Sequence, residues 1–325
     1  MSSGVRPVYV FVGAILVGCK GDEAMPPDSS THSDPIPSGW SEGTGLFEPL
    51  QENAVVALNG EVVVVGGIGS SVATEDRVEA YDPRSDSWRS LAPLPVVVHH
   101  ANAVAHEGKI YVVGSLSPTF EQRGDVWIYD SESDSWSDGA PMTAGTERGG
   151  GAAVVVDGRI HVVGGLRSGE EVAMHSVYDP PSNSWSQLDD MPTPRDHLAA
   201  GSIDGVIYAV GGRNASINGH FDILEAWDGS WSTKAPMPTS RGGIAATVLA
   251  GRLHVFGGEG ADNNRGVFAE HEAYDPATDS WEILDAMPTP RHGTGAAEID
   301  GQIWVPGGAD QAAFGAVATN EAWAP

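Results

Sequence analysis

The stretch from His271 to Gly308, HEAYDPATDSWEILDAMPTPRHGTGAAEIDGQIWVPGG, contains the pattern that the rest of the chain repeats. A Tyr-Asp-Pro turn begins at Tyr274, and Trp281 follows seven residues later. A Met-Pro-Thr-Pro-Arg segment, an alternating apolar run, an Asp-Gly turn and a second apolar run then lead to a Gly-Gly pair. Alternating apolar runs joined by Asp-Gly are typical of β-hairpins, so this stretch predicts short antiparallel strands.

The same order of residues recurs six times along the chain. The intervals between the first glycines of successive pairs are 48, 50, 47, 46 and 50 residues, and Ser115 replaces the second glycine once. A repeat of this length indicates a propeller or a solenoid, because each unit buries its faces only against its neighbours. The first glycines of the pairs are Gly66, Gly114, Gly164, Gly211, Gly257 and Gly307.

A glycine pair, then an aromatic residue, then Trp, at a period near 50 residues, resembles the kelch repeat. The resemblance covers residues 38–325. It implies an all-β fold, a six-bladed kelch-type β-propeller in which each blade is a four-stranded sheet. The recurring Tyr and Trp rings are then packing residues within and between blades, and the glycines meet backbone demands.

The position of Trp40 predicts how the ring closes. The Trp of each repeat precedes the next glycine pair by 26 or 28 residues, and Trp40 precedes Gly66 by 26 although no repeat comes before it. The sixth repeat reaches Trp323 without a fourth strand of its own. We therefore expect an N-terminal strand around Trp40 to complete the sixth blade and remove an open sheet edge.

Residues 1–18 have the features of a lipoprotein signal peptide. The apolar run from Val8 to Val17 is too short to span a bilayer and has the length of a signal-peptide core. Leu16-Val17-Gly18-Cys19 resembles the bacterial lipobox, which implies cleavage before Cys19 and lipidation of its thiol. The alternative is a secretory signal with an incidental cysteine. Residues 19–37, rich in Pro, Ser and Asp, are expected to be a disordered tether, and residues 38–325 to be the propeller.

These features predict a protein of the bacterial cell envelope, at the outer membrane or cell surface, that contacts the membrane only through its lipid. The net charge of −27, from 17 basic and 44 acidic residues, excludes general nucleic-acid binding, which needs a basic surface. We expect a monomer.

Motifs for catalysis or metal binding are absent from the sequence. It contains no His-Glu-x-x-His, no Gly-x-Ser-x-Gly, no phosphate-binding loop and no EF-hand pattern. Kelch-type copper oxidases need a Tyr–Cys crosslink, and the single cysteine here is Cys19. We therefore expect no cofactor and no bound metal, and the sequence favours binding over catalysis.

Candidate ligand-binding residues recur at one position of four adjacent repeats. An arginine lies 16 residues before the glycine pair, where the first two repeats have Leu50 and Val98. Strand order would bring these arginines to the mouth of the central channel, as a positive patch on an acidic body. The alternative is that each guanidinium holds loop carbonyls inside its blade. The candidates are Arg148, Arg195, Arg241 and Arg291, with His100 and His197 in the same region and Arg213 and the segment 259–265 on long loops nearby.

Two classes of function follow. The first is an envelope-anchored binding module that takes a protein or glycan ligand, anionic if the arginines contact it, through its loop face. The second is a carbohydrate-acting enzyme, because bacterial sialic-acid mutarotases are also six-bladed kelch proteins of the envelope. An enclosed pocket with an arginine would favour the enzyme, and a broad shallow face would favour the binding module.

Overall fold

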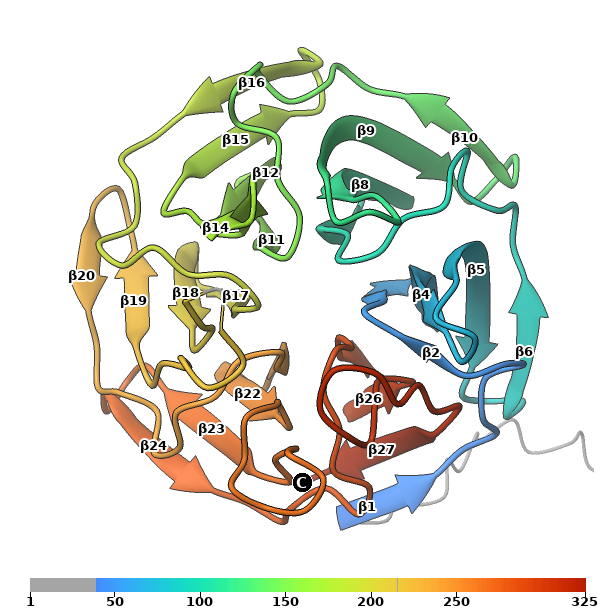
Figure 1. Ribbon diagram of the computed structural model, residues 1–325. Helices are drawn as coiled ribbons and strands as arrows, with labels where there is room; N and C mark the ends of the chain where they lie inside the picture. Colours follow the sequence, from blue (N-terminus) through green and yellow to red (C-terminus); the bar gives the residue numbers. More distant parts are fainter. Residues whose placement is uncertain (1–38, 215) are drawn as a thin grey trace, which may run out of the picture. The chain divides into compact units, whose positions relative to one another are not determined.

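The computed structural model describes residues 39–214 and 216–325, and it shows a six-bladed β-propeller (Figure 1). All the regular elements of the described residues are strands. Six antiparallel sheets, one of five strands in blade 1 and five of four strands, are arranged around a central channel, which confirms the predicted fold class. None of these residues forms a helix that is long and apolar enough to cross a membrane. The predicted signal peptide, Cys19 and the tether lie outside the described residues.

The first three blades follow the chain in order. Blade 1 contains β2 (Leu50–Gln51), β3 (Ala54–Leu58), β4 (Glu61–Gly69), β5 (Thr74–Asp82) and β6 (Ser87–Ser90); blade 2 contains β7 (Ala103–His106), β8 (Lys109–Leu116), β9 (Gln122–Asp130) and β10 (Ser135–Asp138); blade 3 contains β11 (Ala152–Val156), β12 (Arg159–Val163), the hairpin β13 (Leu166–Arg167) and β14 (Glu170–Glu171), β15 (His175–Asp179) and β16 (Ser184–Gln187).

The last three blades repeat this plan. Blade 4 contains β17 (Ala199–Ile203), β18 (Val206–Val210), β19 (Leu224–Trp227) and β20 (Trp231–Thr233); blade 5 contains β21 (Ala245–Leu249), β22 (Arg252–Phe256), β23 (His271–Asp275) and β24 (Ser280–Ile283); blade 6 contains β25 (Ala297–Ile299), β26 (Gln302–Pro306), β27 (Asn320–Ala324) and, from the N-terminal side, β1 (Gly39–Glu42).

The hairpin between β25 and β26 shows why the repeat folds this way. Asp300 and Gly301 have φ values of 51° and 83°, and a type I′ turn requires positive φ at both positions. The innermost strands carry small side chains, among them Ala103, Ala153 and Ala246, toward the channel. Small residues there allow six strands to converge on one axis.

The sixth blade is closed by the N-terminal strand, as Trp40 predicted. Strand β1 pairs antiparallel with β27, and Trp40 lies opposite Trp323 in the register. The indole Nε1 of Trp40 donates a hydrogen bond of 2.9 Å to the backbone carbonyl of Asp285, and its ring contacts Phe256 edge-on. Residues at opposite ends of the described chain therefore share one sheet.

In four of the six blades a Tyr–Trp pair links the blade to its neighbour. The hydroxyl of Tyr129 donates to Asp134, whose carboxylate also accepts the backbone amide of Ala92 from the preceding blade. The indole of Trp136 donates to the carbonyl of the same Ala92, at 2.8 Å. Blades 4 and 6, which have Trp in place of this Tyr, keep the hydrogen bond from the outer indole to the preceding blade. The recurring rings therefore pack within and between blades, as predicted.

Candidate ligand-binding site at the channel mouth

The four recurrent arginines lie inside the blades and not at the channel mouth. Their side chains are at most 1% exposed. The guanidinium of Arg195 donates to the carboxylate of Glu225 at 2.5 Å and to the carbonyl of Ala209 at 3.0 Å. The same contacts join Arg241 to Glu272, and Arg291 to Glu321. The predicted positive patch is therefore wrong: the arginines brace strands within each blade, which was the alternative interpretation.

Arg148 is braced differently. The residue opposite Val162 in its blade is Ser176, where blades 4 to 6 have the glutamates. The guanidinium donates to the Ser176 hydroxyl at 3.0 Å and to several backbone carbonyls, among them those of Gly164 and Val162. Burial lowers the pKa of Arg148 to about 10. With these arginines buried, nothing at their position supports an anionic ligand.

The residues that face the channel lie two positions further along. Each blade places one residue with a left-handed backbone two to four positions before the start of its innermost strand, 14 residues before the glycine pair. Glycine adopts this conformation freely, whereas in other residues it costs roughly 1–2 kcal/mol of conformational free energy. These residues, with φ between 51° and 67°, are Glu52, His100, Gly150, His197, Gly243 and Gly293.

The six residues also form a closed ring of backbone hydrogen bonds. The amide of each donates to the carbonyl of its counterpart in the preceding blade, at distances from 2.5 to 3.0 Å. The ring fixes the distance between blades at this level, so the side chains on it are held on a rigid backbone. Only Glu52, His100 and His197 carry side chains beyond Cα there.

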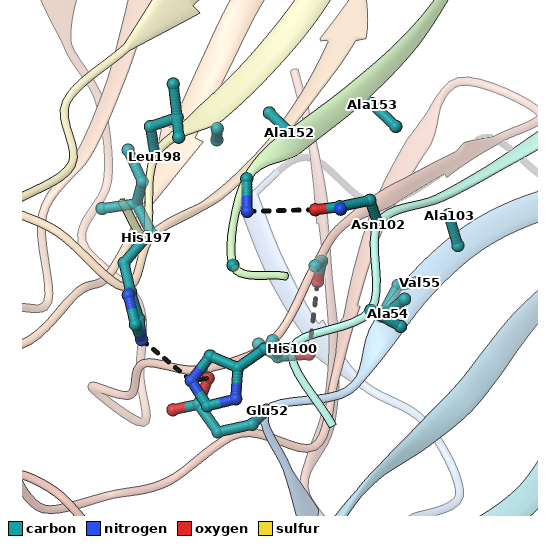
Figure 2. A pocket seen from close by; sticks show the side chains of 18 of the residues that line it. Glu52, Ala54, Val55, His100, Asn102, Ala103, Ala152, Ala153, His197 and Leu198 are labelled. Atoms are coloured by element: carbon teal, nitrogen blue, oxygen red, sulfur yellow. Dashed lines mark hydrogen bonds and ion pairs between the residues drawn. The ribbon is translucent and has the colours of Figure 1, made fainter. Parts of the chain in front are cut away.

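These three side chains converge at the mouth of the channel (Figure 2). The Nε2 atoms of His100 and His197 are 2.9 Å apart, and Nε2 of His100 is 3.2 Å from Oε2 of Glu52. The structure thus brings together the two histidines that the sequence placed in one region. Their role in ligand binding stays a prediction.

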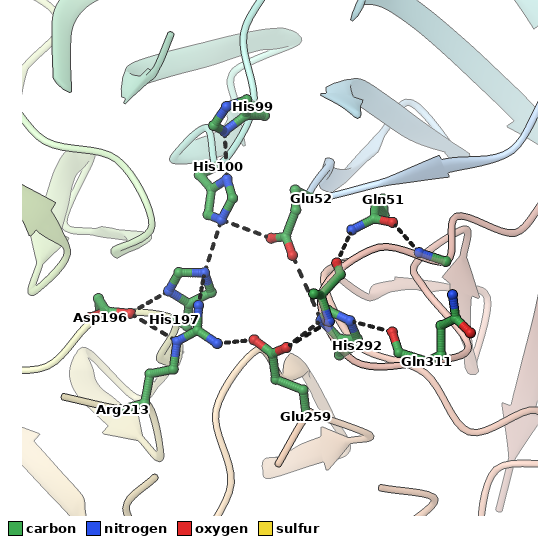
Figure 3. A network of polar contacts seen from close by, with 12 residues as sticks. Gln51, Glu52, His99, His100, Asp196, His197, Arg213, Glu259, His292 and Gln311 are labelled. Carbon is green, nitrogen blue, oxygen red and sulfur yellow. Dashed lines mark hydrogen bonds and ion pairs between the residues drawn. The ribbon is translucent and has the colours of Figure 1, made fainter. Parts of the chain in front are cut away.

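A polar network surrounds the three residues (Figure 3). Asp196 contacts Nδ1 of His197, and Nδ1 of His99 lies 2.6 Å from Nδ1 of His100. On the other side, Arg213 contacts both His197, at 2.8 Å, and Glu259. The sequence had placed Arg213 and Glu259 only on nearby loops, and it had not indicated Glu52 or Asp196.

His292 completes this network from the sixth blade. Its Nε2 lies 3.0 Å from the carbonyl of Gln311, which can only accept a hydrogen bond, so Nε2 carries the proton. Its Nδ1 has no hydrogen-bond partner, and it faces Oε1 of Glu52 at 3.7 Å and Oε2 of Glu259 at 3.6 Å. The ring is 1% exposed.

A cavity of about 180 Å³ opens above these residues. Its floor is polar and includes His100, His197 and Arg213. Its upper walls are apolar and include Phe120 and Phe314, whose side chains are 47% and 43% exposed. The ring of Phe120 packs on His99 with a centroid distance of 4.5 Å. Below the backbone ring, a second cavity of about 170 Å³ continues into the channel between alanine and glycine residues.

The electrostatics of the floor are unbalanced. The carboxylates of Glu52, Asp196 and Glu259 all belong to the network. The guanidinium of Arg213 pairs with Asp196 and Glu259, whereas Glu52 has no arginine or lysine partner among the described residues. Burial, with the nearby His197 as a second cause, holds the pKa of His100 well below its ordinary value, so this imidazole is neutral at pH 7. The floor can therefore accept hydrogen bonds, donate them through Arg213, and bind a cation. Among the residues that the structure describes, Glu52, His100 and His197 have potential metal-ligand atoms that all lie within 4.8 Å of one another.

Family models for kelch repeats match most of the propeller. The model described as the KLHDC2/KLHL20/DRC7 Kelch-repeats domain matches residues 44–212, and two Kelch motif models match residues 194–238 and 240–288. Together these matches run from blade 1 into blade 5.

Similar proteins and structures share the repeat. Kelch-like ECH-associated protein 1A of Danio rerio is 44% identical over 68 residues, which are 20% of this chain and 11% of the relative. Kelch-like protein terF of Aspergillus terreus is 34% identical over 228 residues, 64% of this chain and 49% of the relative. The chain thus spans at most about half the length of these relatives. The solved structure entitled "Structure of YjhT" superposes with a TM-score of 0.73 at 17% identity, over 86% of this chain and 96% of that one, which is a likeness of fold.

Proposed function

Because the chain belongs to the kelch-repeat family, we propose that it is a binding protein that takes a segment of a partner protein at the mouth of its channel. The observation that carries the proposal is the cavity of about 180 Å³ with a polar floor and exposed phenyl rings at its edge. A partner residue inserted there would find hydrogen-bonding groups beneath it and apolar contacts around it.

The loop face provides the apolar contact. Three loop tips that connect the second and third strands of their blades expose Val72, Phe120 and Phe314, in blades 1, 2 and 6. Blades 6, 1 and 2 are neighbours around the ring, so the three loop tips belong to adjacent blades; we call them the 72/120/314 sector. Exposed apolar groups beside a polar cavity are typical of protein-binding surfaces, in which a few aromatic residues supply most of the binding free energy.

The proposal includes attachment to the cell envelope through Cys19. Its support is the sequence Leu16-Val17-Gly18-Cys19 at the end of an apolar run. A tether of residues 19–37 would let the propeller reach on the order of 30 to 60 Å from its lipid. Mass spectrometry of the mature protein should find a lipid-modified cysteine at the N-terminus, and an unmodified chain that starts at Ala24 or later would contradict the anchor.

A second candidate function is chemistry on a sugar, such as mutarotation or epimerisation. The observation that favours it is the neutral imidazole of His100 beside His197 in the mouth cavity, because a neutral imidazole can accept a proton from a sugar hydroxyl. Arg213, however, already pairs with Glu259 and Asp196, so it is not free to hold a substrate carboxylate in this arrangement. NMR of anomeric exchange in N-acetylneuraminate with the purified protein tests this candidate directly.

Capture from envelope extracts of cells that make the protein tests the proposed binding function. We compare the wild-type chain with the double variant Phe120→Ser/Phe314→Ser, and with Ile283→Ser as a matched control, because Ile283 is 72% exposed on the outer strand β24. The double variant should recover its partner about tenfold less well, and the control should not. Equal recovery by all three proteins would refute the assignment, and binding on a glycan array that depends on the same phenyl rings would change the partner class to a glycan.

A further inference from the structure

We propose that Glu52, His100 and His197 form a site for a divalent transition-metal ion of the zinc type. The residues come from blades 1, 2 and 4 and meet where the backbone ring surrounds the channel. The site lies in the cavity assigned above to a partner, but the inference does not depend on that partner.

The separations of the ligand atoms fit one ion. Ligands that surround zinc tetrahedrally at 2.0–2.2 Å lie roughly 3.3 Å from one another. Here Nε2 of His100 is 2.9 Å from Nε2 of His197 and 3.2 Å from Oε2 of Glu52. Two imidazoles and one carboxylate are a donor set that zinc and neighbouring transition metals bind, with room left for a further ligand.

Contacts behind the histidines orient them for this role. The carboxylate of Asp196 accepts from Nδ1 of His197, which leaves the lone pair of His197 on Nε2, toward the mouth. A carboxylate behind a histidine is the usual support of a metal-binding imidazole, because it fixes the tautomer and the ring orientation. Nδ1 of His99 lies 2.6 Å from Nδ1 of His100 and orients that ring. Metal binding through Nε2 of His100 requires that Nδ1 of His100 donate this hydrogen bond.

The unpartnered nitrogen of His292 is an independent sign that positive charge belongs here. Its Nδ1 lone pair is buried and faces the carboxylates of Glu52 and Glu259 at 3.7 and 3.6 Å, with no donor between them. Three electron-rich groups that face one another are stabilised by a cation among them.

Charge and backbone conformation agree with the site. Arg213 pairs with Asp196 and Glu259, whereas Glu52 has no arginine or lysine partner among the described residues, so a divalent ion held by Glu52 would offset its negative charge. Glu52, His100 and His197 also hold left-handed backbones at a position where the other three blades use glycine. Backbone strain at three residues whose side chains lie together indicates that these side chains have a function.

Substitution of Arg213 should change the metal affinity in the opposite direction from substitution of a ligand. Its Nη2 lies 2.8 Å from Nε2 of His197, so in this arrangement it occupies the lone pair that a metal would use. Removing this guanidinium takes away both a competitor and a positive charge. The variant Arg213→Gln should therefore bind metal more tightly than the wild type, whereas loss of a ligand should weaken binding.

The experiment is calorimetric titration of the purified chain, stripped of metals by a chelator, with Zn²⁺ alone, and with Mg²⁺ as a comparison. We expect one Zn²⁺ per chain, with an affinity weakened about 100-fold or more in His100→Gly and His197→Gly, and about 10- to 100-fold in Asp196→Asn. Glycine is the residue of the other blades at this position, so these variants should keep the fold, which melting curves verify. His220→Ala, on the same face but outside the set, is the matched control and should bind as the wild type does.

Two results would overturn the site. Zinc binding that is unchanged in His100→Gly and His197→Gly would show that the ion binds elsewhere. No zinc binding by the folded wild type would show that these three residues do not form a metal site. Because no partner is present, either failure leaves the proposed binding function to be judged by its own capture experiment.

Discussion

The backbone amide of Glu52 donates a hydrogen bond of 2.5 Å to the carbonyl of Gly293, which joins the first blade to the last. The bond is one of six equivalent bonds that encircle the channel. Because the ring consists of backbone groups, its geometry does not depend on which side chains it carries. The propeller can therefore present chosen side chains at three of six positions without changing its fold.

Alanine at two of the ring glycines should separate backbone strain from a local clash. Gly150→Ala is expected to lower the free energy of unfolding by about 1 kcal/mol, because the φ of 62° is left-handed. A Cβ at this position would make only ordinary contact, since its nearest neighbour, in the ring of His100, would lie 3.6 Å away. At Gly293 a Cβ would lie 2.6 Å from Oε1 of Glu52, so that carboxylate must move away. Thermal melting should show a loss in both variants, and zinc titration should show weaker binding only in Gly293→Ala. Equal zinc affinity would contradict the role of Glu52.

Removal of the N-terminal strand should destabilise the whole propeller. Deleting the chain through Glu48 exposes the edge of β27 and removes the contacts of Trp40, so a loss of several kcal/mol is expected. Trp40→Ala alone should cost about 2 kcal/mol, since the indole is partly exposed and loses one hydrogen bond. Denaturant melts measure both. An unchanged midpoint after the deletion would refute closure by β1.

The buried arginines should differ in their contribution to stability. Arg195→Met leaves the carboxylate of Glu225 buried without its partner, and loss of one member of a buried ion pair typically costs about 3–5 kcal/mol. Arg148→Met leaves only a hydroxyl and carbonyls, so its cost should be smaller. Adding Glu225→Met to Arg195→Met should restore part of the loss. Chemical unfolding measures all three, and equal costs at the two arginines would contradict this account.

Acid should destabilise the protein through its buried histidines. Burial lowers the pKa of His254 to about 4 and that of His271 to about 3, with Arg252 and His254 respectively as second causes. In the unfolded chain these groups bind protons near pH 6.5, so stability present above that pH is lost as pH falls toward 4. Each histidine contributes up to about 1.4 kcal/mol per pH unit. Melting of His254→Leu/His271→Phe between pH 6.5 and 4.5 should show a flatter slope, and an unchanged slope would be evidence against neutral histidines in the core.

The fold was predictable because its determinants repeat. Trp40 indicated ring closure through spacing alone, and the pairing of Trp40 with Trp323 confirmed it. Arg195 and its counterparts were misplaced for a related reason: a repeated position reveals equivalence, but not whether a side chain points into a blade or into the channel. The strand carbonyl of Ala209 and the carboxylate of Glu225, which decide the matter, become neighbours only in the folded sheet.

Only some of the residues at the channel mouth could be predicted from the sequence. A comparison of the repeats two positions after Arg195 would have shown Glu52, His100 and His197 where the other blades have glycine. Residues other than glycine at a position with a left-handed backbone are the signal that identifies the site. The contributions of Arg213 and Glu259 depend on long loops, whose conformations no repeat constrains.

The measurement that tests the central claim most directly is site-specific photo-crosslinking in cells that make the protein. A photoreactive phenylalanine analogue replaces Phe314 beside the cavity or, as a control, Ile283 on the outer strand β24. If the channel mouth holds the partner, position 314 should give a discrete crosslinked product and position 283 should give none. Crosslinking at position 283 but not at position 314 would place the binding surface on the outer strands and contradict the account.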